Sequence, residues 1–146
     1  MKHVRCIILL LPLLTALMFV GYSLMVPVVL PSTELQMVLK AMIFGIPVAI
    51  LIGFGRWTGD ETGTTLSGLL LFPLFWIYTQ VLSQMFDPGF VATPLYGLNW
   101  NFFADTAPFV LISGSMGWFA SRKTNQSLFI AIALGVLLIV IIVGIH

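Results

Sequence analysis

The apolar residues of this chain come in long uncharged runs that short polar segments separate. The run from Leu128 to Ile145 carries no charge and is apolar on every face of a helix. A water-facing helix would show a polar stripe and a half-buried strand would alternate, so neither accounts for such a run. Runs of about 20 apolar residues are typical of transmembrane helices. The pattern therefore predicts an all-α integral membrane protein.

The runs predict a bundle of about five transmembrane helices in a single domain, residues 1–146. The expected spans are residues 6–30, 35–55, 66–86, 102–121 and 128–145. A Thr-x-x-Gln capping box that begins at Thr33 predicts the start of the second helix. The basic start of the chain, with Lys2 and Arg5, also resembles a signal peptide. Cleavage of the first run would leave four spans.

The fourth run is shorter than the others. Between Asp105 and Arg122 lie about 16 residues, which rise about 24 Å as a helix, whereas the hydrocarbon core is about 30 Å thick. This run therefore begins earlier, near Phe102, or crosses a locally thinned bilayer, or enters and leaves on the same side. The re-entrant alternative also reduces the bundle to four spans.

The basic residues predict the orientation. With five spans, one side of the membrane holds five of the six Lys and Arg residues, and only Lys40 lies on the other. The positive-inside rule makes the first side cytoplasmic. We therefore expect a bacterial or archaeal cytoplasmic (inner) membrane, with the N-terminus inside and the C-terminus outside. The cytoplasmic residues are Lys2, Arg5, Arg56, Arg122 and Lys123.

Composition narrows the classes of function. The chain is 60% hydrophobic and 8% charged, whereas a soluble domain carries about 25% charged residues. A net charge of +1 does not favour a nucleic-acid partner. The single cysteine, Cys6, excludes an internal disulfide, and His3 and His146 lie at the chain ends, away from mid-helix positions suited to a metal or haem. We expect no cofactor.

Small residues mark predicted sites of close helix packing. In the second helix they recur every four residues, which places them along one face and lets two backbones approach in lipid. This small-residue ridge consists of Ala41, Gly45, Ala49 and Gly53. It packs against the first or third helix of the chain, or it forms a dimer or partner interface. Ser113 and Gly117 form a second such pair, and Ala131 and Gly135 a weaker third.

Polar residues gather on one face of the third helix. They are spaced i, i+3, i+4 and i+7, at Gln80, Ser83, Gln84 and Asp87. If the following loop folds back, these residues and three further ones would line a polar vestibule open to the outer side, for a ligand or partner. The further residues are Asn99, Asn101 and Asp105. Alternatively, the amides bond neighbouring helices, and Asp105 is the N-cap of the fourth helix.

A polar segment, residues 56–65, is expected to be a cytoplasmic loop. Within it, Arg56, Asp60 and Glu61 form a local ion pair, contact a cytoplasmic partner, or are simply solvated.

The sequence does not favour an enzyme, because the serines of the spans have no histidine or lysine beside them within the membrane. We expect a non-enzymatic protein that acts through intramembrane protein–protein contacts, as an accessory or assembly subunit or as an immunity-type binding protein. Its partners would be the lipid bilayer and another membrane protein or a second copy. The alternative is an oligomeric channel or transporter for a small solute or cation, which the kinks expected at Pro47 and Pro73 and the outer acidic groups would serve.

Overall fold

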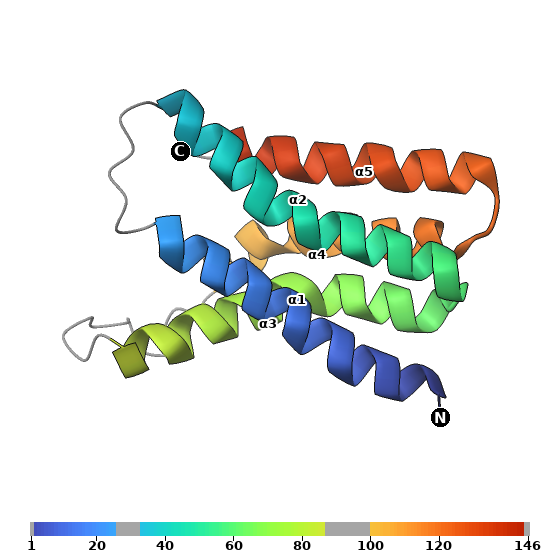
Figure 1. The fold of residues 1–146 in the computed structure, drawn as a ribbon, viewed down its shortest axis with the longest axis horizontal. Helices are drawn as coiled ribbons and strands as arrows, with labels where there is room; N and C mark the ends of the chain where they lie inside the picture. Colours follow the sequence, from blue (N-terminus) through green and yellow to red (C-terminus); the bar gives the residue numbers. More distant parts are fainter. Residues whose placement is uncertain (1, 26–32, 87–99, 145–146) are drawn as a thin grey trace.

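The computed structural model describes residues 2–25, 33–86 and 100–144, and the described residues form five helices, with tight turns from the second helix to the third and from the fourth to the fifth (Figure 1). The all-helical prediction is confirmed. The helices are α1 (Lys2–Met25), α2 (Thr33–Thr58), α3 (Glu61–Phe86), α4 (Trp100–Ser121) and α5 (Asn125–Gly144). The first helix was expected at 6–30, and residues 26–30 lie outside the described part of the chain.

The turn between α2 and α3 is much shorter than the loop expected at residues 56–65. Gly59 ends α2 with a φ of 66°, and its N–H donates to the carbonyl of Gly55 at 2.9 Å. A left-handed residue of this kind is where glycine commonly ends a helix. Asp60 then caps α3, because its Oδ1 accepts from the N–H of Gly63 at 3.0 Å. Helix α3 therefore begins at Glu61 and includes the rest of the expected loop.

A second cap starts α5 three residues before the expected span. The Oγ1 of Thr124 accepts from the N–H of Ser127 at 3.2 Å, which satisfies one of the free donors of the first turn. The Ser127 hydroxyl in turn donates to the carbonyl of Arg122 at 2.6 Å. These bonds make the α4–α5 turn compact.

Helix α4 begins before the apolar run that follows Asp105. An earlier start, near Phe102, was one of the three alternatives for this short run. It covers 22 residues from Trp100, and such a helix is about 33 Å long. Asp105 therefore lies inside α4 and is not its N-cap. The reason is that the preceding Trp-Asn-Phe-Phe stretch is itself helical.

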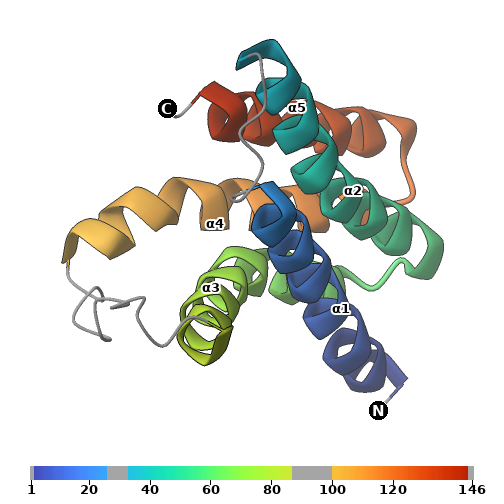
Figure 2. The same ribbon diagram turned by 60° about the vertical axis from the view of Figure 1, so that its left-hand side comes forward.

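The packing is centred on α4, which contacts α3 on one side and α5 on the other (Figure 2). Helix α2 also packs on α4 and on α5, and α1 packs on α2 and α3. The core between the helices is mainly apolar and contains Leu14, Met18, Leu51, Leu71 and Met116, all at most 1% exposed.

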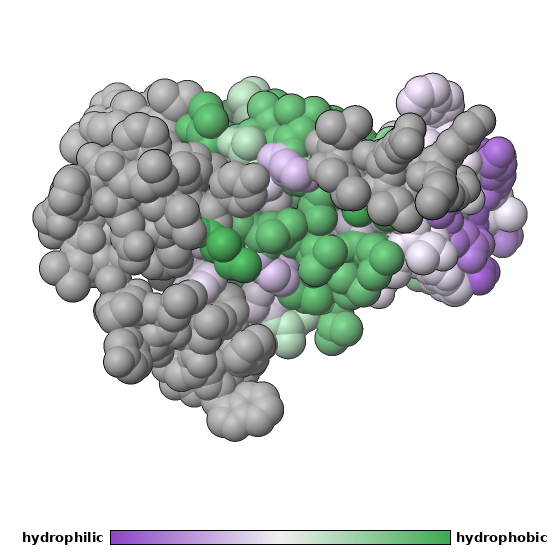
Figure 3. All heavy atoms as spheres, turned by 90° about the horizontal axis from the view of Figure 1, so that it is seen from below, coloured by the Kyte–Doolittle hydropathy of each residue, from purple (hydrophilic) through white to green (hydrophobic). Residues whose placement is uncertain are grey.

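Within the described residues, two of the five helices are long and apolar enough to cross a membrane, at Glu34–Thr58 and Asn125–Gly144, so the five-span bundle stays a prediction. Only 22% of the most apolar stretch of each is buried inside the protein, so neither resembles the covered core helix of a soluble domain. Large apolar side chains are exposed instead, among them Phe129 at 78% and Val140 at 61%. Figure 3 shows hydrophilic residues gathered at one end of the molecule, with hydrophobic surface adjoining them.

Candidate docking groove between α2 and α5

The small-residue ridge of α2 borders α5, which was not one of the two neighbours, α1 and α3, that the sequence favoured. A methyl group placed on Gly45 would lie 3.6 Å from Cδ1 of Ile139 in α5. A methyl group placed on Gly53 would meet no atom within 4 Å. Ala49 and Gly53 are exposed. The ridge is therefore in contact with α5 at Gly45 and open at its other end.

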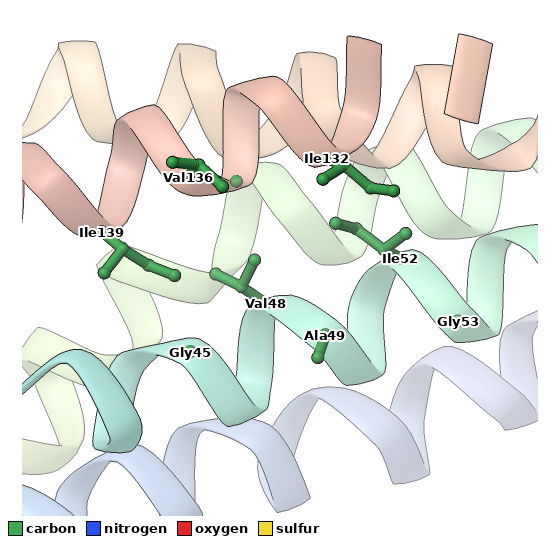
Figure 4. Close-up of a pocket in the computed structure, with 9 residues that line it drawn as sticks. Gly45, Val48, Ala49, Ile52, Gly53, Ile132, Val136 and Ile139 are labelled. Atoms are coloured by element: carbon green, nitrogen blue, oxygen red, sulfur yellow. The ribbon is translucent and has the colours of Figure 1, made fainter. Parts of the chain in front are cut away.

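A groove follows the ridge along the α2–α5 boundary (Figure 4). It has a cavity volume of about 370 Å³. Its walls are aliphatic or glycine throughout: Gly45, Val48, Ala49, Ile52 and Gly53 from α2, and Ile132, Gly135, Val136 and Ile139 from α5. Val48 and Ile52 point towards α5 in Figure 4, and the isoleucines of α5 point back towards α2.

A second hollow of about 370 Å³ lies along the same boundary and shares Ile139 with the first. It is lined at one end of α2 by Met37 and Ala41, and by the last turns of α5. All four residues of the ridge thus line one of two adjoining hollows.

Close contact between α2 and α5 forms the floor of the groove. A methyl group on Gly135 would lie 2.8 Å from Cγ1 of Val48 and 3.3 Å from Cδ1 of Ile52. A larger residue than glycine at position 135 would therefore force the Val48 side chain to shift. The groove exists because Gly135 admits this contact while Ala49 and Gly53 leave the wall above it low.

Arg56 lies at the polar end of the groove. Arg56 follows Ile52 and Gly53 by one helical turn, so it lies on the same face of α2. Its Nη1 donates to the carbonyls of Arg122 and Thr124, each at 3.3 Å, and its Nη2 donates to Oδ1 of Asn125 at 3.4 Å. Asn125 lies on the groove face of α5, seven residues before Ile132. The guanidinium therefore bridges the two helices where the groove ends.

Arg56, for which the sequence allowed a local ion pair, a partner contact or solvation, bonds to the α4–α5 turn. Glu61 pairs with Arg122 instead, with Nε and Oε1 3.8 Å apart and both side chains about half exposed. The Arg122 guanidinium also lies 3.7 Å from the centre of the Trp118 ring. The segment predicted as a simple loop is thus tied to the α4–α5 turn. The sequence signal that could have placed Arg56 at the end of the ridge is its spacing of about one helical turn from Gly53.

The second pair of small residues lies inside the bundle. Ser113 and Gly117 are buried between α4 and α3, and the Ser113 hydroxyl donates to the carbonyl of Gly68 at 2.7 Å. A methyl group on Gly117 would lie 2.9 Å from the carbonyl carbon of Thr64. This pair therefore holds α3 and α4 together and does not form an outer surface.

The polar vestibule lies outside the described side chains. Gln80, Ser83 and Gln84 belong to α3, and Asn101 and Asp105 belong to α4, but only their backbone is described. Asp87 and Asn99 lie outside the described residues. The vestibule stays a prediction.

Among the residues that the structure describes, no three His, Cys, Asp or Glu side chains are grouped so as to hold a metal ion. No protein-family model matches the chain, and neither a curated protein nor a solved structure matches it. The proposals below therefore rest on the groove, its polar end and the exposed apolar surface.

Proposed function

We propose that this chain is a five-span membrane protein that acts through contacts within the bilayer, as an accessory or assembly subunit or as an immunity-type binding protein. A transmembrane helix of the partner docks on the α2–α5 groove. The N-terminus lies in the cytoplasm and the C-terminus outside. The groove is the observation that carries this proposal, because it is an apolar surface with low walls on the outside of the bundle.

Membrane insertion is supported by the length and the surface of the helices. They cover 20 to 26 residues and so rise about 30 to 39 Å, against a hydrocarbon core of about 30 Å. Exposed apolar side chains such as Phe129 and Val140 would be poorly placed in water but are suited to lipid. The α2–α3 and α4–α5 turns lie at one end with the N-terminus, which is the end proposed to be cytoplasmic (Figure 1).

Docking of a helix is supported by the residues of the ridge. In lipid, helices associate mainly through van der Waals contact, which small residues increase because they let backbones approach. Ala49 and Gly53 are exposed, and nothing in the described structure covers Gly53 within 4 Å. A partner helix would therefore bury this part of the ridge without displacing any described residue.

Single cysteines test the orientation. In a Cys6→Ala background, Lys123→Cys should react with a membrane-impermeant thiol reagent only after the membrane is opened, because it lies at the proposed cytoplasmic end. Lys40→Cys should react in intact cells. Equal labelling of the two positions from one side would contradict the five-span arrangement.

Photo-crosslinking from the groove tests the docking. A photoreactive residue at Ala49 should give one discrete protein adduct in native membranes, and Gly53→Leu should abolish it by filling the groove. The matched control is the same photoreactive residue at Leu13, which is 56% exposed on α1. An adduct of twice the chain mass would instead favour the oligomeric channel. Equal adducts from Ala49 and Leu13, or none from Ala49, would refute docking at the groove.

A further inference from the structure

We propose that the groove binds an anionic phospholipid of the leaflet on the Arg56 side, with one acyl chain between α2 and α5 and the headgroup phosphate at Arg56. This inference rests on the proposed membrane insertion but not on the proposed protein partner. It joins two features that lie on the same faces of α2 and α5, an aliphatic groove and a cation at its end.

The charge at the end of the groove fits a phosphate. Among the described residues, the hydrogen-bond acceptors of the Arg56 guanidinium are two backbone carbonyls and one side-chain amide, all of which are neutral. Its positive charge is therefore not balanced by them. Arg122, by contrast, has Glu61 as its partner. A guanidinium has five N–H donors, so Arg56 retains donors for a phosphate oxygen, which forms stronger bonds than a neutral acceptor.

The length of the groove fits one leaflet. From Gly45 to Arg56 the helix rises about 16 Å at 1.5 Å per residue. Half of the hydrocarbon core is about 15 Å. A lipid whose phosphate lies at Arg56 would therefore bring its acyl chain to the level of Gly45 and Ile139, where these two residues meet.

The width of the groove favours an acyl chain at its floor. The floor is the contact of Val48 with Gly135, so the space above it narrows between two touching helices. A helix with its side chains is about 10 to 12 Å wide, so the partner helix proposed above would rest on the rims and cover the acyl chain instead of replacing it. A single row of methylenes enters further, and the lining holds no polar side chain that it would leave without a partner.

The headgroup is tested by lipid binding to the purified full chain in detergent. Phosphatidylglycerol and phosphatidylcholine with identical acyl chains are titrated, and bound lipid is measured by native mass spectrometry. We expect phosphatidylglycerol to bind about tenfold more tightly, because N–H bonds to phosphate are reinforced by the net charge of this lipid. Arg56→Gln should abolish the preference. Lys123→Gln removes one positive charge at the same end of the protein but away from the groove. This variant should retain most of the preference for phosphatidylglycerol.

The acyl chain is tested separately with Gly53→Leu. A methyl group at position 53 would meet no described atom within 4 Å, and the rest of the leucine would fill the groove, so binding of both lipids should fall while the melting temperature holds. Arg56→Lys should keep part of the preference for phosphatidylglycerol. It replaces Arg56→Gln in the headgroup test if Arg56→Gln does not fold.

Three results would overturn the lipid site: equal affinity for the two lipids, equal effects of Arg56→Gln and Lys123→Gln, or unchanged binding in Gly53→Leu. A dimer that buries the groove and excludes lipid would also overturn it. Loss of the protein from membranes on an alkaline wash would refute insertion itself, and with it both proposals. Lipid binding without a crosslink at Ala49 would refute only the protein partner.

Discussion

Replacing Gly117 by alanine should separate the effect of helix packing from that of helix propensity. Gly117 is buried where α4 meets α3, and the added methyl group would lie 2.9 Å from the carbonyl carbon of Thr64 and 3.3 Å from the nitrogen of Thr65. These neighbours are backbone atoms, so they cannot turn aside as the end of a side chain would. The two helices must move apart. Gly53→Ala is the matched control, since its methyl group would meet nothing within 4 Å.

The expected magnitudes have opposite signs. Overpacking costs about 1 to 3 kcal/mol, and alanine recovers about 0.8 to 1.0 kcal/mol over glycine inside a helix. Separation also weakens the bond from Ser113 Oγ to the Gly68 carbonyl, and interhelical bonds in membrane proteins average about 0.6 kcal/mol. Gly117→Ala should therefore lower the free energy of unfolding by about 1 to 2 kcal/mol. Gly53→Ala should leave it unchanged or raise it by up to about 1 kcal/mol.

Unfolding by sodium dodecyl sulfate in mixed micelles, followed by circular dichroism, measures this difference. Both variants receive the same substitution and differ only in what the new methyl group meets. Equal stability of Gly117→Ala and Gly53→Ala would refute the close α3–α4 contact as a source of stability.

Two further predictions concern the α2–α3 turn, and the same unfolding measurement checks them. Asp60→Ala should lower the free energy of unfolding by about 1 kcal/mol, because it removes the N-cap that accepts from Gly63. Glu61→Gln should lower it by between about 0 and 1 kcal/mol, since the ion pair of Glu61 with Arg122 is exposed. A larger loss for Glu61→Gln than for Asp60→Ala would contradict the cap. Gly59→Ala should cost about 1 to 2 kcal/mol because Gly59 has a φ of 66°, and Gly59→Asn should cost less because asparagine adopts this conformation more readily. Equal stability of Gly59→Ala and the unaltered protein would show that the turn relaxes.

The ends of the helices show how far local rules reach. The apolar run 128–145 identified α5, but the helix begins at Asn125, because Thr124 caps it and polar residues can occupy a first turn. The same holds for α3, where the Gly59–Asp60 pair ends one helix and starts the next. Hydropathy measures only where the chain avoids water. The hydrogen bonds of the caps decide where each helix starts.

The candidate site was visible in the sequence only as a pattern on one helix. The four-residue spacing from Ala41 to Gly53 identified a face of α2 suited to close packing, but it contains no information about the neighbour. The structure places α5 there, with Gly135 at the point of contact. For Arg56 the sequence likewise offered a local ion pair with Asp60 or Glu61, a cytoplasmic partner or solvent, but it did not indicate the distant α4–α5 turn.

The sequence by itself determined the helices of this protein, because hydrophobic runs and residue spacing are properties of a chain that neighbouring helices do not alter. It also determined which faces are small, polar or charged. Only the tertiary structure decided that Ser113 and Gly117 are buried against α3, that the ridge of α2 is partly open beside α5, and that Arg56 ends the groove. The physical reason is that packing in a helical bundle depends on which surfaces fit together, and fit is a property of pairs of helices.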